Sequence, residues 1–444
     1  MRKFPNALVI MIGFILFSSI LTYIIPQGSY ERITNPETNQ VKVVEGSYKV
    51  IESESISIFD IFMAIPQGII GRADVITLIL LLGGCFYVID KTGALKEGIV
   101  YLTIKLKGFE ELSLVLVSLV FAAGGALSGL QEEIIAMTPV MLYFTSRLGY
   151  DAFVAVGVSF GSAVIGSSFS PINPFAVVIA QNEAGLPFLS GSGYRLLILF
   201  IAFSLWMYMM IRYANKNRVP KLEAAAITEK SLSARSVIIL ILVALTFAIL
   251  IYGMLVLDWG FVEMTAEFFV LGIIVGIVGK LGLNGTSEAY INGFKEMTFA
   301  AIILGLANSI SIILKQGMII DSIIHGLFTP MQYLPKSLAA VFMMLSQSVL
   351  HLPVPSYSGQ AILTMPILLP LSDLIGLTRQ VCVLAYQYGA VMMDMIVPTN
   401  GALMAVIAIA GISFDKWIKF ALKPMLIILA LCALAIIVAI FIGF

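Results

Sequence analysis

The sequence predicts an all-α polytopic membrane protein built from two inverted repeats, each with a re-entrant hairpin and a broken helix. Three observations predict this fold. Of the 444 residues, 59% are hydrophobic and only 12% are charged, about half the charged share of a typical soluble domain. Long apolar segments follow one another along the whole chain. Finally, matched Pro, Gly and Asn residues recur at a constant offset of 227 positions.

Composition also excludes several classes of protein. The net charge is zero, so no basic face indicates a nucleic-acid partner. Cys85, Cys382 and Cys432 lie in apolar runs without metal-ligand spacing, which is typical of buried small hydrophobic residues. Only two histidines, His325 and His351, are present, which disfavours a histidine-based metal site. We expect no cofactor.

The first predicted element is a spanning helix over residues 7–25. Two positive charges precede about twenty apolar residues, a core longer than that of a signal peptide and without a small-residue cleavage site. We therefore expect a multi-pass protein of the cytoplasmic membrane with its N-terminus inside.

Further along the chain the apolar pattern predicts nine spans in all, because a membrane helix needs about 20 apolar residues. They are 7–25, 74–90, 152–183, 194–214, 236–257, 262–280, 299–314, 379–411 and 424–443. Amphipathic interfacial helices are expected at 57–72, 90–108 and 285–297. Residues 27–57 are expected to form an outer loop with modest strand character, and 215–235 a basic inner linker.

Two more apolar stretches, 111–146 and 337–372, are too long for one helix and carry polar tips, "ALSGLQEE" and "HLPVPSYSGQ". We interpret each as a re-entrant hairpin, because irregular backbone survives at membrane depth only where protein or a watery cavity satisfies it. Charge placement supports this topology. The predicted topology puts 18 of the 26 Lys and Arg residues on the inner side, as the positive-inside rule expects. It puts the C-terminus outside.

The repeat is seen when the chain is shifted against itself. Pro139 then meets Pro366, and Asn173 meets Asn400; Gly149, Val154, Ala163 and Pro171 also meet identical residues. The predicted topology starts the first repeat inside and the second outside, so the repeats are inverted, as in many secondary transporters. The predicted boundaries are 1–214 for the first repeat, 215–261 for a linker and connecting helix, and 262–444 for the second repeat.

Each repeat contains a span of about thirty residues that is interrupted by proline. The interruptions read "SFSPINP" and "MIVPTNG", and they are repeat mates. Proline removes a backbone donor, so freed carbonyls and amides face a cavity there. Ser170, Asn173, Thr399 and Asn400 add oxygen atoms that suit Na+ or the polar atoms of a substrate.

The hairpin tips differ in charge. The first carries Glu132 and Glu133, whereas the second carries Ser356, Tyr357, Ser358 and Gln360. Asp394 precedes the second break by one turn. A charged carboxylate at membrane depth costs about 2.5–3.5 kcal/mol on insertion scales. These acids either sit in a water-filled vestibule or cap a helix, or else they hold a cationic group or carry a proton. No Lys or Arg lies in the neighbouring apolar stretches to pair with the two glutamates.

These motifs resemble the YfcC family of the ion transporter superfamily, which also includes DcuC-type, AbgT-type and DASS-type carriers. The resemblance is carried by "GGCFYVIDKTGALKEGI" (83–99), "GLQEEIIAMTPVM" (129–141), "INPFAVVIAQNEAGLPFLSG" (172–191), "HLPVPSYSGQAILTMPILLPLSD" (351–373) and "VPTNGALMAVIAIAGISFDKWIKF" (397–420). It implies a scaffold domain and a transport domain, a homodimer, and elevator-type alternating access. It also implies that substrate and coupling ions bind between the hairpin tips and the helix breaks.

Two functions remain open from the residues and the resemblance. Related carriers often show Ser-Asn-Thr at the tips, but here the first tip has Leu130-Gln131-Glu132-Glu133. The first hypothesis is a transporter of a cationic amino acid, by arginine/ornithine-type exchange or proton coupling. Glu132, Glu133 or Asp394 would meet the cation, and helix ends at Asn173 or Asn400 the α-carboxylate.

The alternative is a Na+- or H+-coupled carrier of a carboxylate or peptide-like solute. Na+ would then bind at Asn173, Ser358, Thr399 and Asn400. An enzyme is disfavoured, because both histidines are placed near outer interfacial segments and no nucleophile–base set is evident. A channel is disfavoured by the paired broken helices, and a primary pump by the lack of a phosphate-binding loop.

Overall fold

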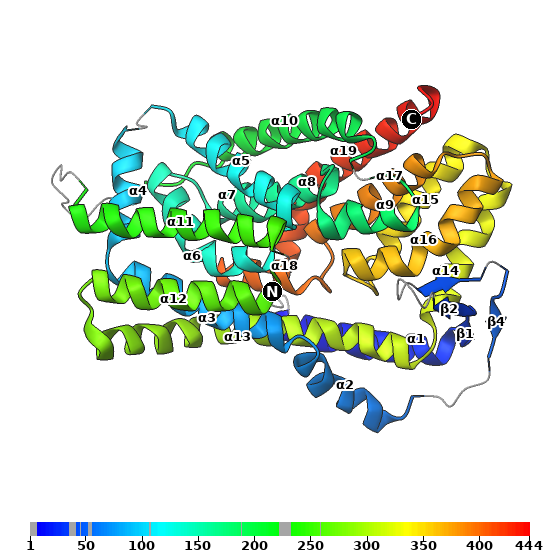
Figure 1. Ribbon diagram of the computed structural model, residues 1–444, viewed down its shortest axis with the longest axis horizontal. Coiled ribbons are helices and arrows are strands. Elements are labelled where there is room, and N and C mark those ends of the chain that lie inside the picture. The colour runs from blue at the N-terminus through cyan, green and yellow to red at the C-terminus, as the bar shows by residue number, and fades with distance from the viewer. Residues whose placement is uncertain are drawn as a thin grey trace.

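The computed structural model describes residues 7–34, 41–44, 46–51, 56–105, 108–187, 189–221, 232–257 and 259–444, and it is built almost entirely of helices (Figure 1). Four short strands form two antiparallel pairs. β1 (Gly28–Ser29) pairs with β4 (Lys49–Val50), and β2 (Arg32–Thr34) pairs with β3 (Val41–Val43). The expected strand character of 27–57 is therefore confirmed within the described residues; 35–40, 45 and 52–55 lie outside them.

Seven helices of the described chain are long and apolar enough to cross a membrane. Five are continuous: α3 (Ala73–Lys91), α10 (Ser192–Lys216), α12 (Phe261–Val278), α13 (Gly282–Gln316) and α19 (Phe414–Phe441). The other two are most of α5 (Glu110–Ser128) and the interrupted segment Ala152–Glu183. The longest helices run roughly along the long axis of the molecule, with α4 at one end and the strands at the other (Figure 1).

The other helices are not among these seven candidates. They are α1 (Ala7–Ile24), α2 (Ile58–Ile70), α4 (Ala94–Lys105), α6 (Glu132–Leu148), α11 (Ala234–Val256), α14 (Ile320–Phe328), α15 (Lys336–Leu350), α16 (Tyr357–Leu374), α17 (Arg379–Met392) and α18 (Gly401–Ile409). Four shorter apolar helical stretches, Leu8–Ile24, Ile58–Ile70, Ala234–Leu250 and Lys336–Leu350, join the seven candidates. The count of nine spans stays a prediction.

Two expected boundaries were wrong. An interfacial helix at 285–297 and a span at 299–314 are one helix of 35 residues, α13. No proline lies within α13, so nothing breaks its hydrogen-bond ladder between the two predicted pieces. Likewise, α19 begins at Phe414 rather than at 424, because it continues through Pro424. Membrane helices tolerate an isolated proline where neighbouring groups satisfy the freed carbonyl.

The two expected hairpins are present as pairs of helices. The first consists of α5 and α6, joined at 129–131, where Gly129 adopts a left-handed conformation with φ of 72°. The second consists of α15 and α16, joined at 351–356. In each pair the N-terminal arm packs along a broken helix, α5 against α8 (Ser162–Phe169) and α15 against α17. That the hairpins are re-entrant stays a prediction.

Both predicted breaks are also present. Helix α7 (Ala152–Val156) continues through a π-helical turn into α8, the chain is extended at Ser170, and a π-turn at Pro174–Val178 leads into α9 (Ile179–Glu183). In the second break, α17 ends in a 3-10 turn at Met393–Met395, and α18 starts at Gly401. Both second halves begin with an asparagine cap, Asn173 and Asn400.

The helices pack as two groups. In one, α3 lies against α12 and α13, and α13 also contacts α1 and α2. In the other, α8 packs against α5 and α10, and α17 against α15, α16 and α19. The groups meet where α13 packs on α18 and α3 on α6, and α17 also contacts α8 and α9. The two broken helices, far apart in sequence, therefore lie side by side. The inverted repeats and their boundaries at 214 and 261 stay predictions.

Candidate functional site

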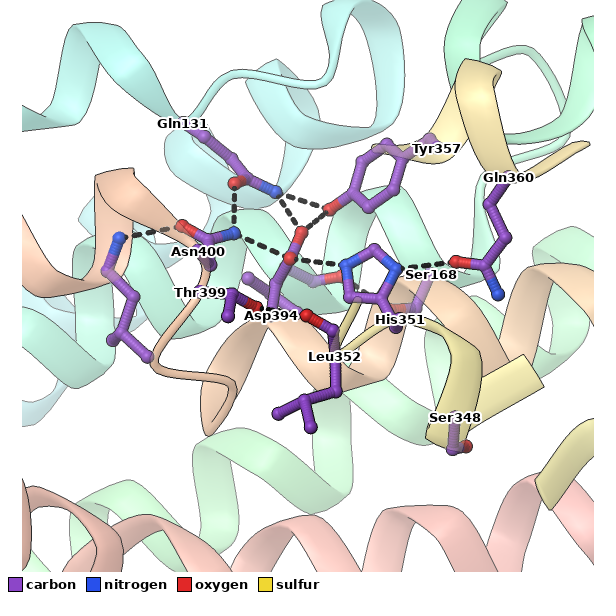
Figure 2. Close-up of polar contacts among 12 residues, drawn as sticks. Gln131, Ser168, Ser348, His351, Leu352, Tyr357, Gln360, Asp394, Thr399 and Asn400 are labelled. Carbon is purple, nitrogen blue, oxygen red and sulfur yellow. Dashed lines mark hydrogen bonds and ion pairs between the residues drawn. The ribbon is translucent and has the colours of Figure 1, made fainter. Parts of the chain in front are cut away.

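Asp394 is the centre of a buried polar cluster (Figure 2). Its side chain is 2% exposed and contacts four polar groups. Oδ1 accepts from Asn400 Nδ2 at 2.5 Å and lies 2.8 Å from His351 Nε2. Oδ2 accepts from Gln131 Nε2 at 2.6 Å and from the Tyr357 hydroxyl. Burial of a carboxylate requires such partners.

The four partners come from both hairpin tips and the second break. Gln131 precedes α6 at the first tip, while His351 and Tyr357 flank the second tip. Gln131 closes the ring, because its Nε2 also contacts the Tyr357 hydroxyl and its Oε1 accepts from Asn400 Nδ2 at 3.1 Å. Asn400 is held in place because its Oδ1 caps α18, accepting from Leu403 N at 2.8 Å. The cluster therefore ties the two tips to one break.

His351 extends the cluster toward Gln360. Its Nδ1 lies 2.8 Å from Gln360 Oε1, and Gln360 Nε2 donates to the backbone oxygen of Gln347 at 2.8 Å. The carbonyl of Gln347 fixes the orientation of the Gln360 amide, so both ring nitrogens of His351 face oxygen acceptors. When Nδ1–H donates to Gln360, the hydrogen bond between Nε2 and Asp394 Oδ1 needs a second proton. The pair is then either an imidazolium with a carboxylate or a neutral imidazole with a carboxylic acid. In either form the pair is neutral.

The first break is arranged differently. Asn173 donates from Nδ2 to the Gly125 carbonyl at 2.7 Å, and its Oδ1 accepts from the backbone N–H of Phe175 and Ala176. Ser170 Oγ donates to the Ala126 carbonyl at 2.6 Å and accepts from Asn173 N at 2.8 Å. Both side chains are fully buried. They attach the break to α5; that the helix end at Asn173 receives a substrate carboxylate stays a prediction.

The two glutamates of the first tip form the first turn of α6, where the helix dipole favours acids. Glu133 is 4% exposed and accepts from Gln131 N at 3.3 Å. Glu132 is half-buried and lies within electrostatic range of Arg72, Asp74 and Asp394. Arg72, the N-cap of α3, is distant in sequence from the tip and acts on Glu132 only at electrostatic range; the described residues show no ion pair between a Lys or Arg and either glutamate.

The remaining predicted residues border the cluster. Ser356 caps α16 by accepting from Gly359 N at 3.2 Å. Thr399 Oγ1 donates to the Leu352 carbonyl at 2.7 Å, which joins the second break to the second tip. Ser358 is half-buried in the first turn of α16. The structure thus brings Tyr357, Gln360, Asp394 and Asn400 into one hydrogen-bonded network, and it attaches Ser170 and Asn173 to the first hairpin.

Sequence reasoning missed Gln131 and His351 as site residues. His351 was placed near an outer interface, but its side chain is completely buried against Asp394. Its position in the polar tip "HLPVPSYSGQ" was the available signal. Gln131 was recognisable only as the neutral member of a tip dominated by two acids. Within the described chain, no group of three His, Cys, Asp or Glu residues has metal-binding geometry. Na+ at Asn173, Ser358, Thr399 and Asn400 stays a prediction.

A buried polar cluster at interrupted, apolar helices is the architecture of a multi-pass membrane transporter. The family model described as DcuC, C4-dicarboxylate anaerobic carrier, matches residues 4–441. The chain belongs to the DcuC family, and it is a secondary transporter. The sequence resemblance is thereby confirmed.

Two curated relatives match over nearly their full length. An uncharacterized protein of Haemophilus influenzae is 31% identical over 481 residues, covering 96% of this chain and 94% of the relative. The Escherichia coli K12 protein YfcC, provisionally named a basic amino acid antiporter, is 29% identical over 465 residues, with 94% and 92% covered. Among solved structures, the Alcanivorax borkumensis YdaH transporter aligns over 99% of both chains at 16% identity with a TM-score of 0.45.

Proposed function

We propose that this transporter moves a cationic amino acid across the cytoplasmic membrane by alternating access, through arginine/ornithine-type exchange or proton coupling. The observation that carries the proposal is the Glu133 carboxylate. It is 4% exposed, and no Lys or Arg of the described chain forms a hydrogen bond or ion pair with it. Buried charges are normally paired, and the ammonium or guanidinium of a solute suits this position.

The electrostatics of the cluster support the same solute class. Because the His351–Asp394 pair is neutral when both of its hydrogen bonds are made, it does not compensate the two glutamates. Arg72 acts on Glu132 only at electrostatic range. A dianionic solute would meet like charge at this tip, which disfavours its binding. The name of the Escherichia coli relative agrees with a basic amino acid.

The test is uptake of labelled arginine into proteoliposomes preloaded with arginine, ornithine, succinate or buffer. Uptake that requires a basic amino acid inside supports exchange. Glu133→Gln and Glu132→Gln should each reduce arginine uptake at least tenfold, because a charged hydrogen-bond partner contributes about 1.5–3 kcal/mol. Glu288→Gln, an exposed acid of α13, is the matched control. Arginine uptake that survives in both glutamate variants contradicts the proposal.

A second candidate is a proton- or Na+-coupled carrier of a carboxylate or peptide-like solute. The observation that favours it is the buried contact between His351 and Asp394, because Asp, Glu and His side chains inside membrane proteins form the proton relays of transporters. The family description, a C4-dicarboxylate carrier, agrees with it. Succinate uptake driven by a proton or Na+ gradient, together with no arginine uptake, would favour this candidate.

Transport by an elevator motion fits the packing. The group of α5–α10 and α15–α19 carries the whole Asp394 cluster and contacts α3 and α13 through a limited set of helices. We propose that this group moves as one body against α3, α12 and α13, in a homodimer as the resemblance implies. Double electron–electron resonance between spin labels on α10 and α12 tests the motion. A distance that does not change between inward- and outward-favouring conditions contradicts it.

A further inference from the structure

Arg195 is a buried cation without an acidic partner. Its side chain is completely buried in the first turn of α10. No carboxylate of the described chain lies within ion-pair distance of it. A buried guanidinium is normally matched by negative charge, so its surroundings indicate what it holds.

The neutral partners of Arg195 use only part of its donor capacity. Nε donates to Gln387 Oε1 at 3.3 Å, and Nη1 donates to Gln380 Oε1 at 3.1 Å and to the Ser190 carbonyl at 3.0 Å. Nη2 is buried and makes no hydrogen bond. Arginine presents five N–H donors in a rigid fork; three are used, and the two on Nη2 are free.

A second buried donor without a partner lies nearby. The Tyr388 hydroxyl is buried and makes no hydrogen bond. Tyr388 follows Gln387, which accepts from Arg195. The side chains of Tyr388 and Arg195 lie within electrostatic range of each other. Gln181 Nε2 shares the Ser190 carbonyl with Arg195 at 2.9 Å. Buried hydroxyl and guanidinium groups are rarely left unpaired, because the loss of hydration costs about 1–3 kcal/mol or more.

The backbone adds positive potential at the same place. Arg195 lies in the first turn of α10, and Gln380, in the first turn of α17, accepts from its Nη1, so the N-terminal ends of both helices lie near the guanidinium. The ring of Phe444 lies 5.8 Å from the guanidinium carbon, and the ring of Phe169 is 4.9 Å from that of Tyr388. Apolar walls of this kind exclude water and strengthen the attraction for a negative charge.

We propose that Arg195 and Tyr388 bind a singly charged anion between the first turn of α10 and the third turn of α17. One negative charge neutralises the guanidinium, and it accepts from Nη2 and from the Tyr388 hydroxyl. The shared chemistry fits two sources, an inorganic anion such as chloride or the carboxylate of the transported solute. The site is joined to the first break, because Gln387, which accepts from Arg195, donates to the Ser170 carbonyl at 2.8 Å.

The first experiment measures the thermal unfolding midpoint of the detergent-purified protein as chloride replaces sulfate at constant ionic strength. The midpoint should rise with chloride in a saturable way. Arg195→Gln should abolish this dependence, and Tyr388→Phe should raise the apparent chloride dissociation constant about tenfold. Arg379→Gln is the matched control, since Arg379 lies on α17, is exposed and pairs with Asp373 at 3.0 Å.

The second arm identifies the source of the anion and rests on the proposed function. Arginine is compared with agmatine, which has the same guanidinium but no carboxylate. Stabilisation by arginine but not by agmatine, lost in Arg195→Gln, assigns the site to the carboxylate of the solute. If chloride raises the unfolding midpoint but neither arginine nor agmatine does, the site binds an inorganic anion. That result supports the anion site and counts against a cationic amino acid as the substrate.

The proposal is overturned if chloride does not change the unfolding midpoint of the wild type, and if arginine and agmatine change that midpoint equally. Tyr388→Phe gives an independent criterion that does not depend on Arg195→Gln folding. If no anion is bound, removing an unpaired buried hydroxyl leaves stability unchanged or raises it at every chloride concentration. If the anion is bound, the same change lowers stability only where chloride saturates the wild type.

Discussion

His351 Nε2 and Asp394 Oδ1 lie 2.8 Å apart in the interior of the protein, one from the second hairpin tip and the other from the second helix break. Because Gln360 Oε1 accepts on the other side of the ring, the pair keeps both contacts only while it holds a shared proton. This one hydrogen bond therefore links the second hairpin tip to the second helix break, and it depends on the protonation state of the cluster.

Asp394→Asn should abolish transport while leaving the protein folded. The Asn amide would place an NH2 donor against a site whose partners are mainly donors: His351, Asn400, Gln131 and Tyr357. We expect the uptake rate to fall at least 100-fold, as one mismatched buried hydrogen bond to a charged group costs about 3 kcal/mol. The measurement is solute uptake in proteoliposomes, with the elution profile as the folding control.

His351→Gln should weaken transport without abolishing it. A glutamine side chain keeps one of the two contacts of the ring, to Asp394 or to Gln360, and loses the other. We expect the uptake rate to fall about tenfold, since a buried hydrogen bond contributes about 0.5–1.5 kcal/mol. The measurement is solute uptake in proteoliposomes, and uptake at the wild-type rate would contradict a role of His351 in holding the cluster.

Gln131→Ala should loosen the first tip from the second break. The change removes the contacts of one amide with Asp394, Tyr357 and Asn400. A double-mutant cycle with Asn400→Ala measures the coupling in the thermal stability, which should be about 0.5–3 kcal/mol for residues in one network. Additive effects of the two substitutions would contradict direct contact between them.

Asn173→Ala should act mainly on stability, in contrast to Asn400. It removes an N-terminal cap and the bond to the Gly125 carbonyl, and caps of this type contribute about 0.5–2 kcal/mol. We expect a lower unfolding midpoint with the apparent KM for the solute unchanged in the folded fraction. A changed KM would indicate that Asn173 binds solute or ion, as the sequence predicted.

Gly166→Ala should separate α5 from α8. A Cβ atom at Gly166 would lie 1.9 Å from the Ala122 carbonyl oxygen, and one at Gly125 would lie 2.0 Å from that of Ala163. Such reciprocal small-residue contacts allow membrane helices to approach closely. We expect a reduced yield of folded protein and a lower unfolding midpoint. Gly13→Ala, where nothing lies within 4 Å of the added carbon, is the matched control and should have little effect.

Much of this arrangement was predictable from the sequence, and its local chemistry explains why. Apolar runs of about twenty residues, polar tips between them and prolines inside them determine where helices begin, turn and break. Asn173 and Asn400 follow each break directly, so their role as helix caps is a local property. Asp394 was identified for the same reason, since any carboxylate in an apolar run needs a partner.

Only the tertiary structure decided which partners those groups obtain. Arg72 acts on Glu132, and Gln131 bonds to Asp394 across 263 positions of sequence, because helix packing rather than spacing brings them together. His351 is likewise buried against Asp394 only because the second tip folds onto the second break. The sequence by itself determined which residues need partners, through the cost of leaving polar groups unpaired in an apolar medium. The packing of helices that are distant in sequence decided which residues become the partners, because side-chain contacts depend on distances that no local pattern encodes.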